Sequence, residues 1–190
     1  MDQNLKSEIR KCTDILQQGG IILYHTDTVW GIGCDATNNE AVERIFRLKR
    51  REDSKSMLVL LDDPGKIQSY ASMPDIAIDL LEAAVRPMTI LDPEARNLAS
   101  GLITPEKTIG IRITEELFSK ELVRTFKKPI VSTSANISGE PAPAFYDEIS
   151  DEIKEGVDYI VGYRREERIR HTPSSIIRLG INGEIKIIRK

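Results

Sequence analysis

The sequence predicts an α/β fold in which a mixed sheet and its flanking helices form a single domain spanning residues 1–190. A chain of 190 residues can bury one hydrophobic core and is short for two. Segments with helical spacing of apolar residues alternate along the chain with short apolar runs typical of buried strands. A predicted hairpin near the end requires antiparallel pairing, so the sheet contains both strand orientations.

The first half of the chain carries three predicted helices. Leu5, Ile9 and Leu16 share one face of the first helix, which stops at Gly19-Gly20. Asn38 can cap the second helix, because its side chain can accept a hydrogen bond from a free backbone N–H group. The third helix is expected from about residue 75 to 85. Three apolar runs are predicted strands: 21–24, 57–61 and 89–91.

The second half continues the same alternation after a loop-like stretch over 92–107. Thr114 is predicted to cap a helix that runs to about Phe126, between strands at 108–113 and 129–133. Two prolines in 139–143 break the chain before another helix. Three short strands close the chain, near 159–161, 175–179 and 185–188, with residues 180–183 as the hairpin turn.

Composition limits the class of protein. The net charge of −3 argues against a surface built throughout for nucleic acid. The start lacks a signal-peptide pattern and no run is long enough for a membrane helix, so a soluble cytoplasmic protein is expected. Cys12 and Cys34 form no CxxC pair and are expected to be reduced and buried. His25 and His171 have no second ligand at metal spacing, so no metal site is predicted.

The common nucleotide and nucleophile motifs are missing. Gly65-Lys66 lacks both flanking elements of a Walker A loop, and neither a G-x-G-x-x-G nor a G-x-S-x-G pattern occurs. Phosphate groups would therefore have to bind to scattered cations and polar loops.

Lys49 is the cation whose position in the pattern stands out. It follows Ile45 and Phe46 at helical spacing, so it continues the apolar stripe and is expected to point over the sheet. The alternative is a surface lysine whose stem packs on apolar neighbours. Arg44 and Arg47 lie off the stripe and are expected to be solvated.

Two polar loops follow predicted strands. The run Thr133-Ser134-Ala135-Asn136-Ile137-Ser138-Gly139 offers hydroxyls, an amide and backbone N–H groups that can hold a phosphate, although a capped turn explains it as well. The run Tyr24-His25-Thr26-Asp27-Thr28-Val29-Trp30-Gly31-Ile32-Gly33 passes from a strand into a polar loop with glycines that allow close approach of a ligand. Its simpler interpretation is a strand and turn with a packed Trp30.

Together with Lys49-x-Arg51, these two runs resemble the threonylcarbamoyl-AMP synthases, the YrdC/Sua5/TsaC family. The likeness includes Thr108-Ile109-Gly110-Ile111-Arg112 and Pro173-Ser174-Ser175-Ile176, and it extends from about Gly19 to the end. The combination of K-x-R and S-x-N, in this order, is specific for the family. The length favours the short, single-domain TsaC type, since the longer Sua5 form carries a second domain.

The resemblance implies a twisted, open, mixed sheet and a nucleotidyltransferase reaction. In this family L-threonine, bicarbonate and ATP give threonylcarbamoyl-AMP and pyrophosphate, with Mg²⁺ accompanying the phosphates. A separate tRNA threonylcarbamoyl transferase complex then uses the product to modify tRNA. A weak contact with tRNA or double-stranded RNA is compatible with this role.

The resemblance also assigns residues to roles. Catalysis is assigned to Lys49, Arg51, Ser134 and Asn136. The ATP site adds Lys55, Thr108, Ala135 and Arg189 to these four. The threonine site is assigned to Thr28, Arg112, Thr133 and Ser174, with Arg112 as the natural partner of the substrate carboxylate.

This sequence departs from the family pattern at a few positions. The family usually has proline where His25 and Ser56 stand, and tyrosine at Trp30. Its Pro-Gly-Pro-x-Thr stretch appears here as Val85-Arg86-Pro87-Met88-Thr89, so Arg86 adds a cation to that loop.

The competing hypothesis is a non-catalytic module that binds double-stranded RNA or tRNA. Basic residues cluster between Arg44 and Lys55 and again between Arg164 and Arg170, where they could contact phosphates. Acidic residues interrupt both clusters, and only 5% of the chain is aromatic, which leaves few side chains for base stacking. The synthase is therefore the favoured prediction.

Overall fold

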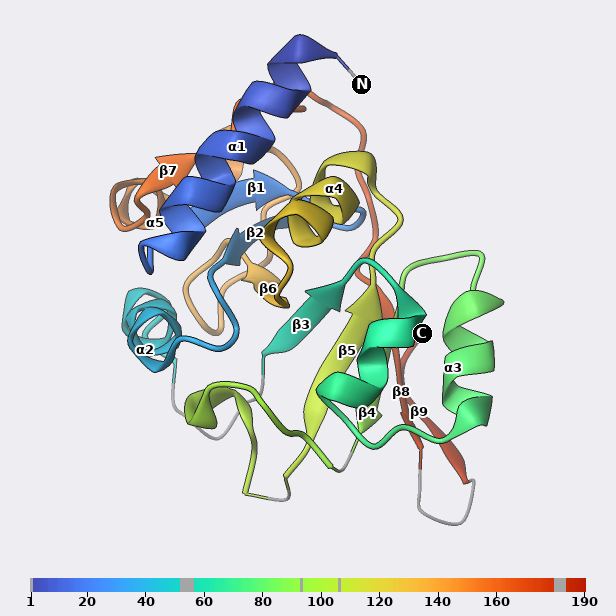
Figure 1. Cartoon of the computed structure of the whole chain (residues 1–190). Helices are drawn as coiled ribbons and strands as arrows, with labels where there is room; N and C mark the ends of the chain where they lie inside the picture. The colour runs from blue at the N-terminus through green and yellow to red at the C-terminus, as the bar shows by residue number, and fades with distance from the viewer. Residues whose placement is uncertain (1, 52–56, 93, 106, 180–183) are drawn as a thin grey trace.

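One mixed sheet forms the centre of the computed structural model, which describes residues 2–51, 57–92, 94–105, 107–179 and 184–190 (Figure 1). Within these residues the sheet has nine strands in the order β7-β1-β2-β6-β3-β5-β4-β8-β9. The strands are β1 (Ile22–His25), β2 (Trp30–Gly33), β3 (Leu58–Leu61), β4 (Met88–Asp92), β5 (Ile109–Ile113), β6 (Ile130–Ser134), β7 (Tyr159–Ile160), β8 (Ser175–Leu179) and β9 (Ile185–Arg189).

Both strand orientations occur, which confirms the predicted mixed sheet. The pairs β1–β7, β3–β5 and β4–β8 are parallel. The other five neighbouring pairs are antiparallel, including the terminal pair β8–β9. The predicted hairpin is therefore present, while its turn at 180–183 lies outside the described residues.

Helices cover both faces of the sheet. They are α1 (Gln3–Gln17), α2 (Asn39–Leu48), α3 (Asp75–Glu82), α4 (Leu117–Phe126) and α5 (Asp151–Glu155), with short 3₁₀ segments at Pro64–Ser69, Ser100–Leu102 and Tyr146–Glu148. The side chain of Asn38 accepts a hydrogen bond from the backbone N–H of Ala41, which confirms the predicted cap of α2.

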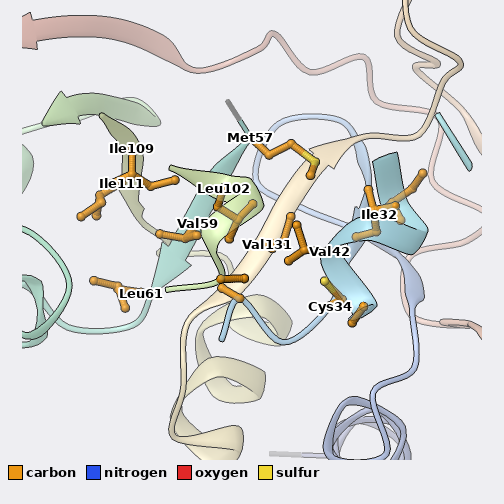
Figure 2. Close-up of a cluster of buried hydrophobic side chains, with 14 of the residues drawn as sticks. Ile32, Cys34, Val42, Met57, Val59, Leu61, Leu102, Ile109, Ile111 and Val131 are labelled. Carbon is orange, nitrogen blue, oxygen red and sulfur yellow. The ribbon is translucent and has the colours of Figure 1, made fainter. Parts of the chain in front are cut away.

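The pleat of the strands sends alternate side chains into two separate cores. In β1, Ile22 and Tyr24 pack with α1 and α4 on one face. Leu23, between them, packs on the other face with the apolar side of α2. The core on the α2 face draws on α2, β3, β5 and β6, and Figure 2 shows Val42, Val59, Ile111 and Val131 converging there.

Three local predictions were wrong. Residues 30–33, for which no separate strand was predicted, form β2, because Gly31 and Ile32 pair with the end of β6. Helix α4 is capped by Glu116 rather than Thr114: the Glu116 carboxylate accepts from the N–H of Ser119 at 2.8 Å. The third helix ends at Glu82, and 83–85 lie beyond it.

Within the described residues, no helix has the combination of length and apolar character that spanning a bilayer requires.

Candidate active site

A cavity of about 350 Å³ lies on the α1–α4 face of the sheet, beside these helices. Leu60 points into the core beneath α4, and its neighbour two residues earlier on the same face, Leu58, lies at the cavity. Leu58 is the cross-strand partner of both Ser132 and Gly110, which also line the cavity. The cavity therefore occupies the part of this face that α1 and α4 leave uncovered.

Much of the predicted site meets at this cavity. The predicted residues that line it are Thr28, Arg51, Arg112, Thr133, Ser134, Ser174 and Arg189. They come from β5, β6, β9 and the loops next to β1, α2 and β8, segments far apart in the sequence.

Lys49 lies behind the 134–138 loop. It is the residue after α2, its side chain is 1% exposed, and its amine donates to the backbone carbonyls of Ser134 and Asn136, the latter at 2.6 Å. Burial, with a smaller contribution from Arg51, lowers the pKa of this amine to about 7. The two carbonyls favour the ammonium form and oppose that shift. Lys49 thus ties the end of α2 to the loop whose first residue, Ser134, lines the cavity.

The rest of the loop is a closed turn. The Asn136 side-chain amide donates to the carbonyl of Glu140 at 2.7 Å, and its Oδ1 is buried without a hydrogen-bond partner in the described part of the chain. Ala135 is buried, and its N–H donates to the carbonyl of Trp30. Asn136 and Ala135 therefore shape the loop, while Ser134 faces the cavity.

Arg112 forms a buried polar group with Asp27 and Thr28. Its guanidinium is 3.1 Å from an Asp27 carboxylate oxygen and 3.2 Å from the Thr28 hydroxyl. Burial raises the pKa of Asp27, and the charge of Arg112 opposes that rise. Arg112 Nε is buried without a hydrogen-bond partner among the described residues. Arg112 thus combines a buried positive charge with an unused donor.

Ser174 and Arg189 are held together at the opposite wall. The Ser174 hydroxyl lies 2.9 Å from that of Thr89, and the Arg189 guanidinium donates to the Ser174 carbonyl at 2.9 Å. This links β4, β9 and the residues before β8 in one hydrogen-bonded corner.

Of the other predicted ATP-site residues that the structure describes, Thr108 lies apart from this group. Thr108 is buried and exchanges hydrogen bonds with Thr104, so its hydroxyl is used within its own loop. Lys55 lies outside the described residues.

The electrostatics of the cavity favour an anionic ligand. Arg51, Arg112 and Arg189 contribute three guanidinium groups, and the described walls carry no carboxylate. A magnesium ion at such walls would be bound by hydroxyls, water and the phosphates of its ligand, so the donors fit Mg²⁺ that arrives with a nucleotide.

Comparison with known proteins places this site in a family. Residues 14–190 match the family model Sua5/YciO/YrdC, whose description reads telomere recombination. The chain belongs to the Sua5/YciO/YrdC family.

A curated member of the Sua5/YciO/YrdC family aligns over almost the whole chain. The threonylcarbamoyl-AMP synthase of Pseudoalteromonas translucida is 33% identical over 184 residues, which cover 95% of this chain and 97% of the relative. The resemblance inferred from the motifs is thereby confirmed.

Two solved structures share the Sua5/YciO/YrdC fold. Escherichia coli YciO superposes with a TM-score of 0.83 at 23% identity, covering 96% of this chain and 88% of its own. Pyrococcus abyssi Sua5, crystallised with L-threonine, gives a TM-score of 0.79 at 24% identity over 90% of this chain. The present chain spans half the length of that Sua5 chain.

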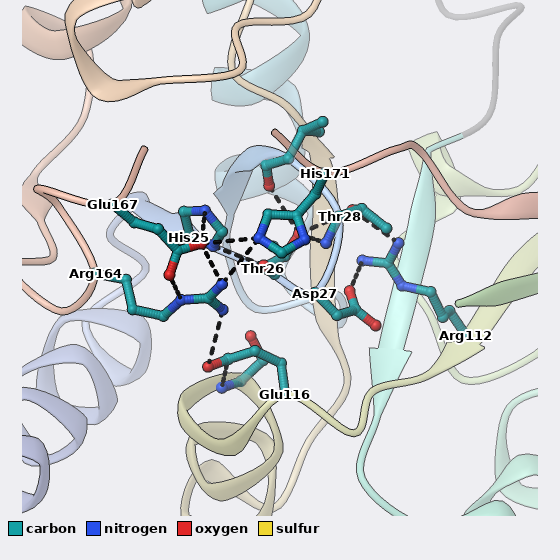
Figure 3. Close-up of polar contacts among 11 residues, drawn as sticks. His25, Thr26, Asp27, Thr28, Arg112, Glu116, Arg164, Glu167 and His171 are labelled. Atoms are coloured by element: carbon teal, nitrogen blue, oxygen red, sulfur yellow. Dashed lines mark hydrogen bonds and ion pairs between the residues drawn. The ribbon is translucent and has the colours of Figure 1, made fainter. Parts of the chain in front are cut away.

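One polar cluster beside the cavity was not predicted from the sequence. His25, Glu167 and His171 come together with Arg164 beside Asp27 and Thr28 (Figure 3). Burial, with a smaller contribution from Arg164, lowers the pKa of His25 to about 4, whereas the Arg164 hydrogen bond lowers that of Glu167 to about 2. Sequence spacing gave no signal, because the fold brings His25 to residues near the other end of the chain.

Proposed function

We propose that this chain is a threonylcarbamoyl-AMP synthase, a nucleotidyltransferase that forms threonylcarbamoyl-AMP and pyrophosphate from L-threonine, bicarbonate and ATP. The observation that carries the proposal is the cavity lined by three arginines and several hydroxyls, without a carboxylate on its described walls. Such a surface suits a substrate set that brings a carboxylate, bicarbonate and a triphosphate to one place. The family relationship and the curated relative support the same reaction.

Arg112 is proposed to bind the carboxylate of threonine. Its position is set by Asp27 and Thr28, and it lines the cavity as one of three guanidinium groups there. The hydroxyls of Thr28, Thr133 and Ser174 lie on the same cavity and can meet the amine and hydroxyl of the substrate.

Arg51 and Arg189 are proposed to bind the nucleotide, with Arg51 and the Ser134 loop at the triphosphate. Ser134 lines the cavity, while Lys49 and Asn136 hold the loop from behind. In this arrangement Lys49 positions the loop and adds positive charge beneath it. Ala135, Thr108 and Lys55 remain predicted members of the ATP site from the family motif.

The chemistry needs no protein nucleophile. The threonine amine and bicarbonate condense to a carbamate with loss of water. A carbamate oxygen then bonds to the α-phosphorus of ATP as the bond to the pyrophosphate oxygen breaks. The protein contributes positioning and positive charge at the phosphates, where one preorganised donor contributes about 3 kcal/mol to the lowering of the barrier. A tRNA threonylcarbamoyl transferase complex is the proposed consumer of the adenylate.

The alternative RNA-binding function loses support from the pairing of the basic residues. Arginines from both sequence clusters form hydrogen bonds or ion pairs with partners on the same chain: Arg44 with Asp158, Arg50 with Glu152, Arg164 with Glu167, Arg165 with Tyr146, Arg168 with Asp147 and Arg170 with Glu148. Internal partners reduce the positive charge that these side chains can present to a phosphate backbone.

Pyrophosphate release tests the proposal directly. Purified protein with Mg²⁺ and ATP should release pyrophosphate only when both L-threonine and bicarbonate are present. Arg112→Lys should raise KM for threonine by at least about tenfold, because lysine cannot reproduce the planar guanidinium contacts. Arg51→Ala should lower kcat/KM by about 10²–10³-fold.

Arg178→Ala is the matched control, since Arg178 is exposed on β8 and does not line the cavity. Its kinetics should equal those of the wild type. Release that ignores threonine, or equal losses in all three variants, would contradict the assigned roles.

A further inference from the structure

His25, Glu167 and His171 form a compact set of metal-ligand side chains outside the proposed active site. One ligand atom from each lies within 4.8 Å of the others. His171 Nε2 is 2.8 Å and His25 Nε2 is 3.7 Å from the same Glu167 oxygen, Oε1 (Figure 3). The two imidazole rings meet edge to face, with centroids 5.6 Å apart.

The hydrogen bond of His25 fixes which ring nitrogen is available. Its Nδ1 lies 2.7 Å from the carbonyl oxygen of Thr26, which can only accept, so Nδ1 carries the hydrogen. In the neutral ring Nε2 is then left with its lone pair, on a side chain that is 2% exposed and directed at a carboxylate. An Nδ1–H donated to a backbone carbonyl is the arrangement that orients a metal-ligating histidine.

A positive group already occupies the space that a cation would take. Arg164 Nη2 is 2.5 Å from Glu167 Oε1 and 3.2 Å from His171 Nε2. Arg164 also has a second carboxylate within reach, because its Nη1 lies 3.6 Å from Glu116 Oε1. The guanidinium can therefore turn toward Glu116 and keep a partner when another cation binds Glu167.

We propose that His25 Nε2, His171 Nε2 and Glu167 Oε1 bind a divalent transition-metal ion of the Zn²⁺ class, in competition with the guanidinium of Arg164. Two imidazoles and one carboxylate suit Zn²⁺ and its neighbours, whereas Mg²⁺ and Ca²⁺ prefer oxygen ligands throughout. Tetrahedral binding at about 2.1 Å places ligand atoms roughly 3.4 Å apart, so small side-chain rotations convert the present spacing into a site.

The ion would join two segments that border the cavity. His25 precedes Thr26 and Thr28, and His171 precedes Pro173 and Ser174, all four of which line the cavity. Binding would fix these two walls against each other and stabilise the folded chain by mass action.

Metal titration of tag-free, chelator-treated protein tests the site. Calorimetry with Zn²⁺ should show one ion per chain, and Co²⁺ should give visible absorption bands of a tetrahedral complex. Both histidines of the chain belong to this cluster, so loss of binding in His171→Ala would locate the bound ion there. His171→Ala and Glu167→Gln should each weaken Zn²⁺ binding by more than about tenfold. Glu166→Gln, at the exposed adjacent position, is the matched control and should bind as the wild type does.

A second test uses a variant that should bind Zn²⁺ more tightly, a result that misfolding cannot produce. Arg164 has a φ of 57°, and asparagine accepts this conformation readily. Arg164→Asn removes the competing guanidinium, whose Nε and Nη2 both donate to the Glu167 carboxylate. Zn²⁺ affinity should therefore rise by at least about tenfold, the cost of displacing one of these hydrogen bonds between charged groups. Absence of saturable binding in both wild type and Arg164→Asn would overturn the proposal, and so would binding that survives His171→Ala.

Discussion

The buried amine of Lys49 is hydrogen-bonded to the backbone of the 134–138 loop. Lys49 is 1% exposed, yet its amine has carbonyl acceptors on both sides of Ala135. The Ser138 N–H returns a hydrogen bond to the Lys49 carbonyl at 2.9 Å. Hydrogen bonds from a buried charged group to fixed acceptors hold the loop firmly, because breaking them would leave that group unsatisfied.

The lowered pKa of Lys49 predicts a pH-dependent contribution to stability. In the unfolded chain the amine titrates near its ordinary pKa of 10.5, and in the folded chain near 7, so the folded state binds fewer protons between these values. The free energy of unfolding should therefore gain from Lys49 as the pH rises through this window, by at most about 1.4 kcal/mol per pH unit. Below pH 7 both states are protonated, and the cost of burying the charge is present in full.

Urea unfolding of wild type and Lys49→Met between about pH 7 and 9 measures this contribution. The wild-type free energy of unfolding minus that of the variant should increase with pH. A difference that stays constant would mean that the two carbonyls keep the ammonium at its ordinary pKa.

For single residues, the sequence predicts the location of a side chain when that location follows from local spacing. The apolar stripe of α2 predicted that Lys49 would point over the sheet, with a surface lysine as the alternative; the structure buries its side chain against the 134–138 loop, which rules out the surface position. His25 lies close to Glu167 and His171 because of the path that the chain follows between them. No local sequence pattern predicts this contact.

Strand β2 shows how pairing decides an element that local preference does not. Two of its four residues are glycine, which disfavours a strand, and no separate strand was predicted there from the sequence. The structure places β2 between β1 and β6, where both neighbours supply hydrogen bonds. Strand β3 was predicted because all four of its residues are apolar, the composition that burial on both faces of a sheet leaves in a sequence.

Gly33 is the glycine in β2 whose replacement should harm the sheet most. A Cβ at this position would lie 2.8 Å from the carbonyl oxygen of Val131 and 2.8 Å from Tyr24 Cε1. The first is backbone of a paired strand and the second belongs to a fully buried ring, so neither yields easily. Gly33→Ala should lower the free energy of unfolding by about 1–3 kcal/mol.

Chemical denaturation of Gly33→Ala beside Gly65→Ala measures the effect. Gly65 lies in an exposed segment, where the nearest atom to a new Cβ is the Asp63 side chain at 3.2 Å. Gly65→Ala should change stability by less than about 0.5 kcal/mol. Equal effects at the two sites would show that β6 shifts to accommodate the methyl group.

The whole molecule consists of two cores that share one sheet. Leu16 belongs to the core under α1 and α4, and Ile45 to the core under α2, yet alternate residues of β1 enter both. Neither core can lose its packing without disturbing strands that line the other. The cavity lies on the same sheet, so its geometry depends on both cores.

This shared sheet predicts a single cooperative unfolding transition for residues 1–190. Leu16→Ala and Ile45→Ala should each lower the free energy of unfolding by about 2–5 kcal/mol, because each leaves a space in a packed core. Trp30, the one tryptophan of the chain, reports from the α2 core, while far-UV circular dichroism reports on all helices. In both variants the two signals should change at the same denaturant concentration.

Ile76→Ala provides the control, since Ile76 is 51% exposed on α3 and should matter little. The decisive comparison is Leu16→Ala followed by both signals. If helical signal is lost while Trp30 fluorescence keeps its native value, the α1–α4 core unfolds separately. Coincident transitions would instead mean that damage under α1 reaches Trp30 on the opposite face, which is possible only if the sheet transmits it.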